Sequence, residues 1–157
     1  MISVVMATYN GEKYIERQLT TLLEQTRRPD EVIICDDVST DNTAQLVQDF
    51  IKEHSLADKW HFSINEKNLG YRKNFAQALA KATGNYIFLA DQDDDWHLNK
   101  IAKMVALMQQ QPEIKALNCA VQLIDANGEP LNLPENKAFY NAGFIYSKAP
   151  LAKLTQF

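Results

Sequence analysis

Short apolar runs alternate along this chain with longer segments in which apolar residues recur every three or four positions. Runs of β-branched and aromatic residues predict strands, because such side chains pack well on a pleated surface. Strands are expected at residues 2–7, 31–37, 59–65, 85–90 and 114–125. Apolar residues at helical spacing predict helices in the intervening segments. Helices are expected at residues 12–26, 38–54, 71–82 and 96–108.

Strands that alternate with helices indicate an α/β fold, with a mainly parallel sheet and helices on both faces. The carboxyl ends of parallel strands meet at one edge of the sheet, where such folds bind ligands. Polar segments follow the first four predicted strands at that edge: ATYNGE, DDVSTDNT, NEKNLGYRKN and DQDDD. The sequence therefore predicts a ligand crevice along this edge.

Four aspartates crowd the end of the fourth predicted strand, in the segment FLADQDDDW. Like charges this close repel one another, and a buried carboxylate without a partner is unfavourable. Mg²⁺ or Mn²⁺ would relieve the repulsion, since both prefer oxygen ligands. We expect Asp91 and Asp93 to bind a metal or ligand. We expect Asp95, or alternatively Asp94, to cap the helix that begins near Trp96.

Two further aspartates, Asp36 and Asp37, directly follow the second predicted strand. A carboxylate at a strand end can accept hydrogen bonds from a ribose or a base amide. Ser39, Thr40 and Asp41 are candidates for capping the next helix. No GxGxxG motif follows the first strand, so nucleotide phosphates would have to be held in another way.

Composition narrows the class of protein. The chain has 157 residues, of which 46% are apolar, so one compact domain with a real core is expected. Its net charge of −4 and scattered basic residues argue against a nucleic-acid partner. No apolar run approaches the roughly 20 residues of a membrane span, and no signal peptide is evident, so a soluble, cytoplasmic protein is expected. Cys35 and Cys119 are expected to be buried thiols.

Four blocks of sequence together resemble the family 2 glycosyltransferases, which have the GT-A fold. They are VVMATYNGEKYIERQLTTLLEQT, EVIICDDVSTDNT, NEKNLGYRKNFAQALAKATGNYIFLADQDDDW and HLNKI, and the match extends over residues 2–124. The D-Q-D-D-x-W segment from Asp91 to Trp96 is similar to the bacterial rhamnosyltransferase-like branch. The resemblance implies a nucleotide-sugar-binding GT-A core over residues 1–125 and the beginning of an acceptor-side region over residues 126–157.

The resemblance also implies roles for individual residues. Asp37 would contact the base, usually uracil or thymine, and the segment after the first strand would lie along the nucleotide. Asp93 would be the direct metal ligand, with Asp91 beside it. Asp94 would face the donor sugar or the acceptor, which makes it the candidate catalytic residue. The residues implied to bind nucleotide-sugar are Ala7, Thr8, Tyr9, Glu12, Asp37, Asn68, Gly70, Lys73 and Asp91.

Simpler roles stay open for several of these residues. Tyr9 could pack at the sheet edge. Asn68 and Gly70 could serve only to form a turn. Lys73 could be a surface lysine, although its place near the rim also suits contact with a phosphate.

The implied activity is transfer of a hexosyl or rhamnosyl group from a UDP- or dTDP-linked sugar to a hydroxyl of a glycan or lipid-linked acceptor. The transfer would invert the anomeric carbon, use Mn²⁺ or Mg²⁺, and serve polysaccharide or cell-surface glycan synthesis, with peripheral association at the inner face of the membrane left open. No general base is identified. Family members usually supply it from beyond the D-x-D block, so this chain could be an incomplete, inactive fragment.

Two alternatives from other classes remain. A non-catalytic nucleotide-sugar-binding module would share the donor site but lack turnover. A Mg²⁺-binding receiver domain would also place an acidic pair after an early strand. The receiver domain predicts an aspartate after the third strand and a lysine after the fifth, where this chain offers Asn65 and Asp125.

Overall fold

The computed structural model describes residues 1–119, 121–125, 128–131 and 144–147. The chain divides into two compact units, Met1–Lys103 and Met104–Phe157. The predicted boundary at residue 125 stays a prediction. None of the helices in the described part of the chain has the length and apolar character that crossing a membrane requires.

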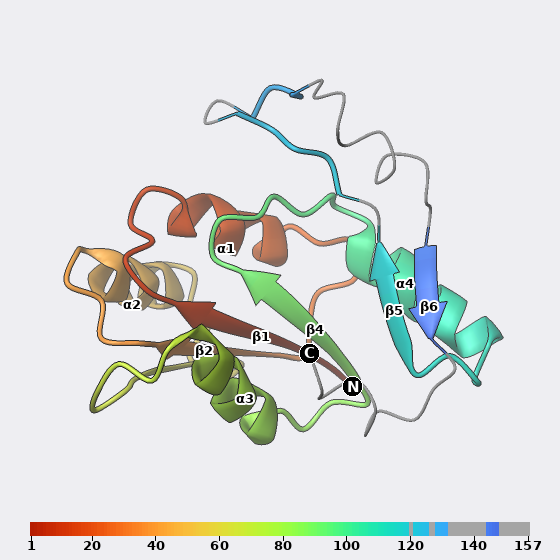
Figure 1. Cartoon of the computed structure of the whole chain (residues 1–157), viewed down its shortest axis with the longest axis horizontal. Coiled ribbons are helices and arrows are strands. Elements are labelled where there is room, and N and C mark those ends of the chain that lie inside the picture. Colours follow the sequence, from red (N-terminus) through yellow and green to blue (C-terminus); the bar gives the residue numbers. More distant parts are fainter. Residues whose placement is uncertain (120, 126–127, 132–143, 148–157) are drawn as a thin grey trace. The chain divides into compact units, whose positions relative to one another are not determined.

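A four-stranded parallel sheet with the order β3-β2-β1-β4 forms the centre of the first unit. The chain steps outward from β1 to β3 and then returns to the other side of β1, so right-handed crossovers place α3 opposite α1 and α2. Figure 1 shows α3 on one side of the sheet and α1 with α2 on the other. The predicted α/β fold with helices on both faces is confirmed. The elements are β1 Ile2–Thr8, α1 Ile15–Leu23, β2 Glu31–Asp36, α2 Thr43–Glu53, β3 Trp60–Ile64, α3 Tyr71–Lys81 and β4 Tyr86–Asp91.

Alternate residues of the central strands supply two apolar layers. Val5, Ile33 and Cys35 pack against Ala78 of α3, with Phe75 beside them. The alternate residues of the same two strands point to the opposite face, because strand side chains alternate. These residues are also fully buried: Val4, Met6, Val32 and Ile34. Cys35 is a buried thiol, as predicted, whereas Cys119 is only half-buried.

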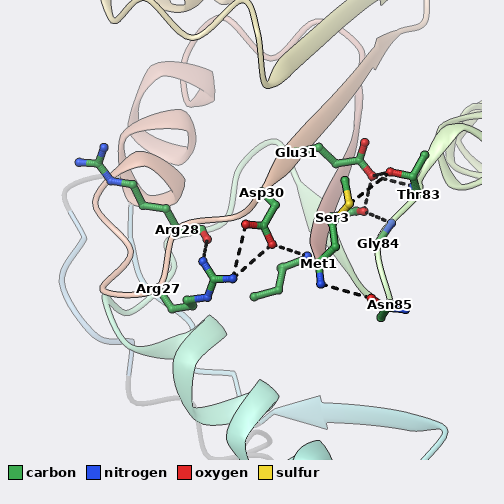
Figure 2. A network of polar contacts seen from close by, with 10 residues as sticks. Met1, Ser3, Arg27, Arg28, Asp30, Glu31, Thr83, Gly84 and Asn85 are labelled. Carbon is green, nitrogen blue, oxygen red and sulfur yellow. Dashed lines mark hydrogen bonds and ion pairs between the residues drawn. The ribbon is translucent and has the colours of Figure 1, made fainter.

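Glu31 anchors a polar network at the amino edge of the sheet (Figure 2). Its carboxylate accepts hydrogen bonds from the Ser3 hydroxyl and from the amide and hydroxyl of Thr83, at 2.6 and 2.9 Å. The Gly84 amide donates to Ser3 Oγ at 2.8 Å. Burial by itself would raise the pKa of Glu31, but these hydrogen bonds outweigh it and hold the pKa below its ordinary value of 4.5.

The neighbouring carboxylate, Asp30, is satisfied in the same region (Figure 2). It accepts a hydrogen bond from the Ile2 amide at 2.8 Å and pairs with Arg27 at 3.2 Å. The Ile2 hydrogen bond is the largest influence on the pKa of Asp30 and holds it below the ordinary value of 3.8. Figure 2 also shows the Asn85 side chain at this edge of the sheet.

The fourth helix begins later than predicted. α4 spans Lys100–Gln110, whereas the sequence predicted a start near Trp96. The preceding residues use their backbone carbonyls elsewhere: His97 accepts from Gln25 Nε2 at 2.9 Å and Leu98 from the Thr26 amide at 2.8 Å. Contacts with the segment that follows α1 therefore replace a first helical turn, and the predicted cap at residue 94 or 95 is wrong.

The fifth predicted strand is shorter than expected and pairs differently. β5 spans Ala116–Cys119 and pairs antiparallel with β6, Phe144–Ser147. Within residues 121–125 and 128–131, an isolated bridge joins Ile124 and Pro130. A turn was predicted at DANGEP, and Gly128, one of its described residues, has a φ of 87°.

Candidate functional site

Strand register gathers the predicted polar residues at the carboxyl edge of the sheet. Ala7 lies opposite Asp91, and Thr8 opposite Asp36, across neighbouring parallel strands. A cleft of ≈ 380 Å³ opens there. It is lined by Ala7, Thr8, Tyr9, Asp37, Asn68, Gly70, Tyr71, Asn74, Phe75, Asp91, Gln92 and Asp93.

Most of the sequence-predicted site residues line this cleft, but three do not. Glu12 Oε2 accepts a hydrogen bond from the Asn42 amide at 3.0 Å and so ties the loop after β1 to the start of α2. Lys73 is exposed in the first turn of α3, and Asp94 is exposed beside the cleft. Their proposed roles toward a ligand stay predictions, as do those of the lining residues.

Asp37 is 2% exposed and is held by the loop between β3 and α3. Its Oδ1 accepts from Asn65 Nδ2 at 2.8 Å and from the Leu69 amide at 2.7 Å. Its Oδ2 accepts from the Gly70 amide at 2.8 Å. A carboxylate offers about four lone-pair positions, so Oδ2 keeps one position for a further donor. Gly70 suits this position because its φ is 79°, a conformation that favours glycine.

Linked amide side chains connect the loop between β3 and α3 to α3 and β2. Asn65 donates to Asn74 Oδ1 at 3.0 Å and accepts from Gln77 Nε2 at 2.6 Å. Asn74 is 1% exposed and donates to the Cys35 carbonyl at 2.7 Å. Because Asn65 and Asn74 each have both a donor and an acceptor engaged, the Asn65 amide is oriented with its NH₂ group toward Asp37.

Asp36 is fully buried and serves the turn that follows β2. It accepts from the Thr8 hydroxyl at 2.8 Å and from the Ser39 amide and hydroxyl at 2.8 and 2.6 Å. Val38, in the same turn, has a φ of 63°. This value is unusual for a β-branched residue and places local strain directly beside Asp37.

The residues predicted to cap α2 instead join two loops. The N-cap is Asn42, without a side-chain hydrogen bond to the helix. Ser39 Oγ accepts from the Asn10 amide at 2.9 Å, and the Thr40 amide donates to Asn10 Oδ1 at 2.8 Å. Of the three predicted caps, only Asp41 accepts from an amide of the first helical turn, that of Thr43 at 3.0 Å. The capping prediction is wrong for Ser39 and Thr40.

The aspartates after β4 repel one another. Desolvation is the largest cause that raises the pKa of Asp91 above its ordinary value of 3.8, although the residue is exposed at the rim. The charges of Asp94 and Asp93 raise this pKa further, while Lys100 lowers it. Among the described residues, no three His, Cys, Asp or Glu side chains stand together as a complete metal site.

The other residues of this acidic segment are engaged in packing. Asp95 accepts from Arg17 Nε at 2.9 Å and forms an ion pair with the same guanidinium. Trp96 is 4% exposed, lies 5.9 Å from the Phe88 ring between centroids, and has the Lys100 ammonium over its face at 3.8 Å. Asp95 and Trp96 therefore fix the segment that carries Asp93 to α1 and the sheet.

Sequence reasoning missed four lining residues, Tyr71, Asn74, Phe75 and Gln92, as candidate ligand contacts. Gln92 Oε1 accepts from the Tyr9 amide at 2.9 Å, and Gln92 Nε2 donates to the Tyr9 carbonyl at 3.0 Å. The sequence signal for Asn74 was a polar residue four positions before Ala78, on the face of α3 that is buried. Nothing in the sequence pattern identifies Tyr9 as the partner of Gln92, because they lie 83 positions apart.

Comparison with known proteins identifies relatives of this chain. The model of the family "Glycosyl transferase family 2" matches residues 3–148. TuaG of Bacillus subtilis (strain 168), which is named for teichuronic acid biosynthesis, is 32% identical over 111 residues, 71% of this chain and 43% of that protein. The dTDP-rhamnosyl transferase RfbG of Shigella flexneri is 36% identical over 103 residues, 64% of this chain and 35% of its own length.

Solved structures share the fold. TarS 1–349 of S. aureus in complex with UDP has a TM-score of 0.63 and 32% identity, covering 71% of this chain and 32% of that one. The mannosyltransferase PcManGT of Pyrobaculum calidifontis, in complex with GDP-Man and Mn²⁺, has a TM-score of 0.69 and 25% identity, covering 78% and 35%. These are GT-A glycosyltransferases, so the predicted GT-A fold is confirmed. The chain spans less than half the length of the curated relatives described above.

The receiver-domain alternative does not fit the sheet. Receiver domains have the strand order 2-1-3-4-5, in which the third strand lies beside the first. Here β4 lies beside β1, and β3 lies beyond β2.

Proposed function

Since this chain belongs to glycosyl transferase family 2, we propose that it binds the donor of a glycosyltransferase and takes part in sugar transfer for glycan synthesis. The proposed reaction moves a hexosyl or rhamnosyl group from a nucleotide-diphosphate sugar to an acceptor hydroxyl, with inversion and with a divalent cation. The observation that carries the proposal is the cleft, whose lining includes the acceptor carboxylate of Asp37 together with Asp91 and Asp93.

Asp37 is proposed to recognise the base. Three amide groups, of Asn65, Leu69 and Gly70, donate hydrogen bonds to its carboxylate and hold it in place. The remaining lone pair on Oδ2 suits a ligand N–H group. Uracil and thymine present one such N–H, which supports UDP- or dTDP-linked donors. The relatives leave the base open, because TarS is bound to UDP and PcManGT to GDP-Man.

Asp93 and Asp91 are proposed to hold Mn²⁺ or Mg²⁺. The residues fit such an ion, because carboxylate oxygens are its preferred ligands, and a bound cation would offset the desolvation and the charges of Asp94 and Asp93 that raise the pKa of Asp91. The rest of the coordination shell would come from water and donor phosphates, since the described residues include no third protein ligand. A bound cation would neutralise the charge that develops on the leaving diphosphate.

The chain's own residues would then position the donor. Ala7, Thr8 and Tyr9 line the cleft at the end of β1 and are proposed to lie along the nucleoside, and Asn68 and Gly70 line it from the loop before α3. Asp94 is the proposed contact to the sugar or the acceptor. A general base near the acceptor hydroxyl is also needed, and none is assigned among these residues.

Calorimetric titration with UDP, dTDP and GDP, each with and without Mn²⁺, tests the proposal. We expect at least one nucleotide to bind wild type in a metal-dependent manner, and Asp93→Ala to lose this metal-dependent part. Asp49→Ala is the matched control, because it removes the same charge from an exposed position in α2, outside the residues that line the cleft. Equal binding with and without Mn²⁺, or equal loss in both variants, contradicts the metal assignment.

A non-catalytic donor-binding fragment is the second candidate. The observation that favours it is length, since the chain spans less than half of its curated relatives. Release of free sugar from UDP- or dTDP-linked hexoses, above the rate given by Asp93→Ala, would establish turnover. Nucleotide binding without any such release would favour the binding fragment.

A further inference from the structure

Gln92 joins the two strand ends that form the proposed donor cleft. Its side-chain amide pairs with the Tyr9 peptide in both directions, through one accepted and one donated hydrogen bond. Tyr9 directly follows β1, and Gln92 directly follows β4, so the contact closes the carboxyl edge of the sheet across the strand pair. Both residues line the cleft, as do Asp91 and Asp93 on either side of Gln92.

Gly11 leaves the space that Gln92 occupies. A Cβ built on Gly11 would lie 2.4 Å from Gln92 Oε1, 2.5 Å from Cδ and 2.9 Å from Nε2. The three nearest atoms all belong to the end of this one side chain. Residue 11 therefore has to be glycine for Gln92 to reach the Tyr9 peptide.

We propose that Gln92 is a positioning residue that fixes the backbone of Tyr9 as the nucleoside wall of the donor cleft. The inference rests on the proposed function and deepens it by assigning a role to the middle residue of the D-Q-D segment. Asp91 and Asp93 are the proposed cation ligands, whereas Gln92 uses both of its hydrogen-bonding groups on the neighbouring loop.

The physical effect is preorganisation. A peptide held by two hydrogen bonds is already ordered before the ligand arrives, so less conformational entropy is lost on binding. The entropic cost of ordering the backbone of one residue corresponds to a change of about tenfold in affinity. The effect acts on the nucleoside wall, so it is expected both with and without a divalent cation.

Three variants separate this role from a general structural one. Gln92→Ala removes both hydrogen bonds, and Gly11→Ala displaces the Gln92 side chain while leaving its chemistry intact. The double variant Gly11→Ala/Gln92→Ala removes the clash together with the side chain. Gln48→Ala, at an exposed position in α2, is the matched control for losing a glutamine side chain.

The first measurement is made without ligand. Tyr9 N–H donates to Gln92, so its hydrogen exchange, followed by NMR, is expected to be several-fold faster in Gln92→Ala and in Gly11→Ala than in wild type. The melting temperature is expected to stay near that of wild type, because the contact is exposed.

The second measurement is the Kd for UDP, dTDP and GDP, with and without Mn²⁺. Each single variant is expected to raise the Kd of the preferred nucleotide about tenfold under both conditions, and the double variant is expected to be no weaker than Gln92→Ala. In an active preparation, the donor KM rises and kcat stays within about twofold. Asp93→Ala differs, since it removes only the metal-dependent part.

The outcomes are distinguishable. If wild type binds a nucleotide and the single variants bind it with unchanged Kd, the role of Gln92 is overturned while the proposed function stands. If the two single effects multiply in the double variant, Gly11 does not act through Gln92 and the inference also falls. If wild type binds none of the three nucleotides, the proposed function falls and takes this role with it.

Discussion

The two edges of the parallel sheet treat carboxylates in opposite ways. At the amino edge, Glu31 and Asp30 are surrounded by hydroxyl, amide and guanidinium donors, and the pKa of each is lowered (Figure 2). At the carboxyl edge, desolvation and then the charges of Asp94 and Asp93 raise the pKa of Asp91. The amino edge therefore stabilises the fold through its charges, whereas the carboxyl edge retains a charge imbalance that a ligand can relieve.

The carboxyl edge is itself divided. Asp36 and Asp37 are buried, and nearby side chains and amides donate hydrogen bonds to both carboxylates. Oδ2 of Asp37 keeps one acceptor position for a further donor. Asp91 and its neighbours lie at the exposed rim. A buried carboxylate that presents an acceptor in a fixed orientation needs local donors that hold it in place. Carboxylates that bind a cation together need oxygen atoms that are free of such donors.

The largest effect should come from neutralising one carboxylate at each edge. Glu31→Gln should lower the free energy of unfolding by about 2 to 3 kcal/mol, because three donors exchange a charged acceptor for a weaker, neutral one. Asp91→Asn should leave it unchanged or raise it, because repulsion from Asp93 and Asp94 is relieved. Urea unfolding at pH 7 with a chelator present measures both. Equal losses would show that Asp91 also has a stabilising partner.

A smaller contrast should come from adding a methyl group at each edge. A Cβ on Gly84 would lie 2.7 Å from the Ser3 backbone nitrogen and 3.1 Å from the Met1 carbonyl oxygen, so the strand must shift. Gly84→Ala should destabilise the fold by about 1 to 3 kcal/mol. Gly11→Ala meets only a flexible side-chain end and should cost less than about 0.5 kcal/mol. Thermal unfolding of both variants checks this order, and a larger loss in Gly11→Ala would contradict it.

The smallest effect should appear in the pH dependence of the amino edge. The pKa of Glu31 is lower in the folded state than in the unfolded chain, so its stabilisation is fully present above about pH 4.5 and is lost as the pH falls through the folded-state value. The difference in unfolding free energy between wild type and Glu31→Gln should therefore shrink below pH 4.5. Glu53→Gln, at an exposed position in α2, should show no such trend.

Much of the fold could be predicted because its signals are local. Strand and helix periodicities lie within single segments, and they located each element of the first unit to within a few residues at most ends. The start of α4 could not be predicted, because Gln25 and Thr26 of a distant segment bind the carbonyls that a longer helix would have used. Ser39 does not cap α2 for a similar reason, since its hydroxyl oxygen accepts a hydrogen bond from the amide of Asn10, 29 positions away.

The sequence by itself determined the kinds of element, the parallel sheet and the acidic motif after β4, because each depends on neighbouring residues. Only the tertiary structure decided which carboxylates have partners. Glu31 receives its donors from positions 28 and 52 residues away, and Gln92 finds Tyr9 across 83 residues. A hydrogen bond depends on the distance between two atoms in space, and the register of the strands, rather than their order in the chain, sets that distance.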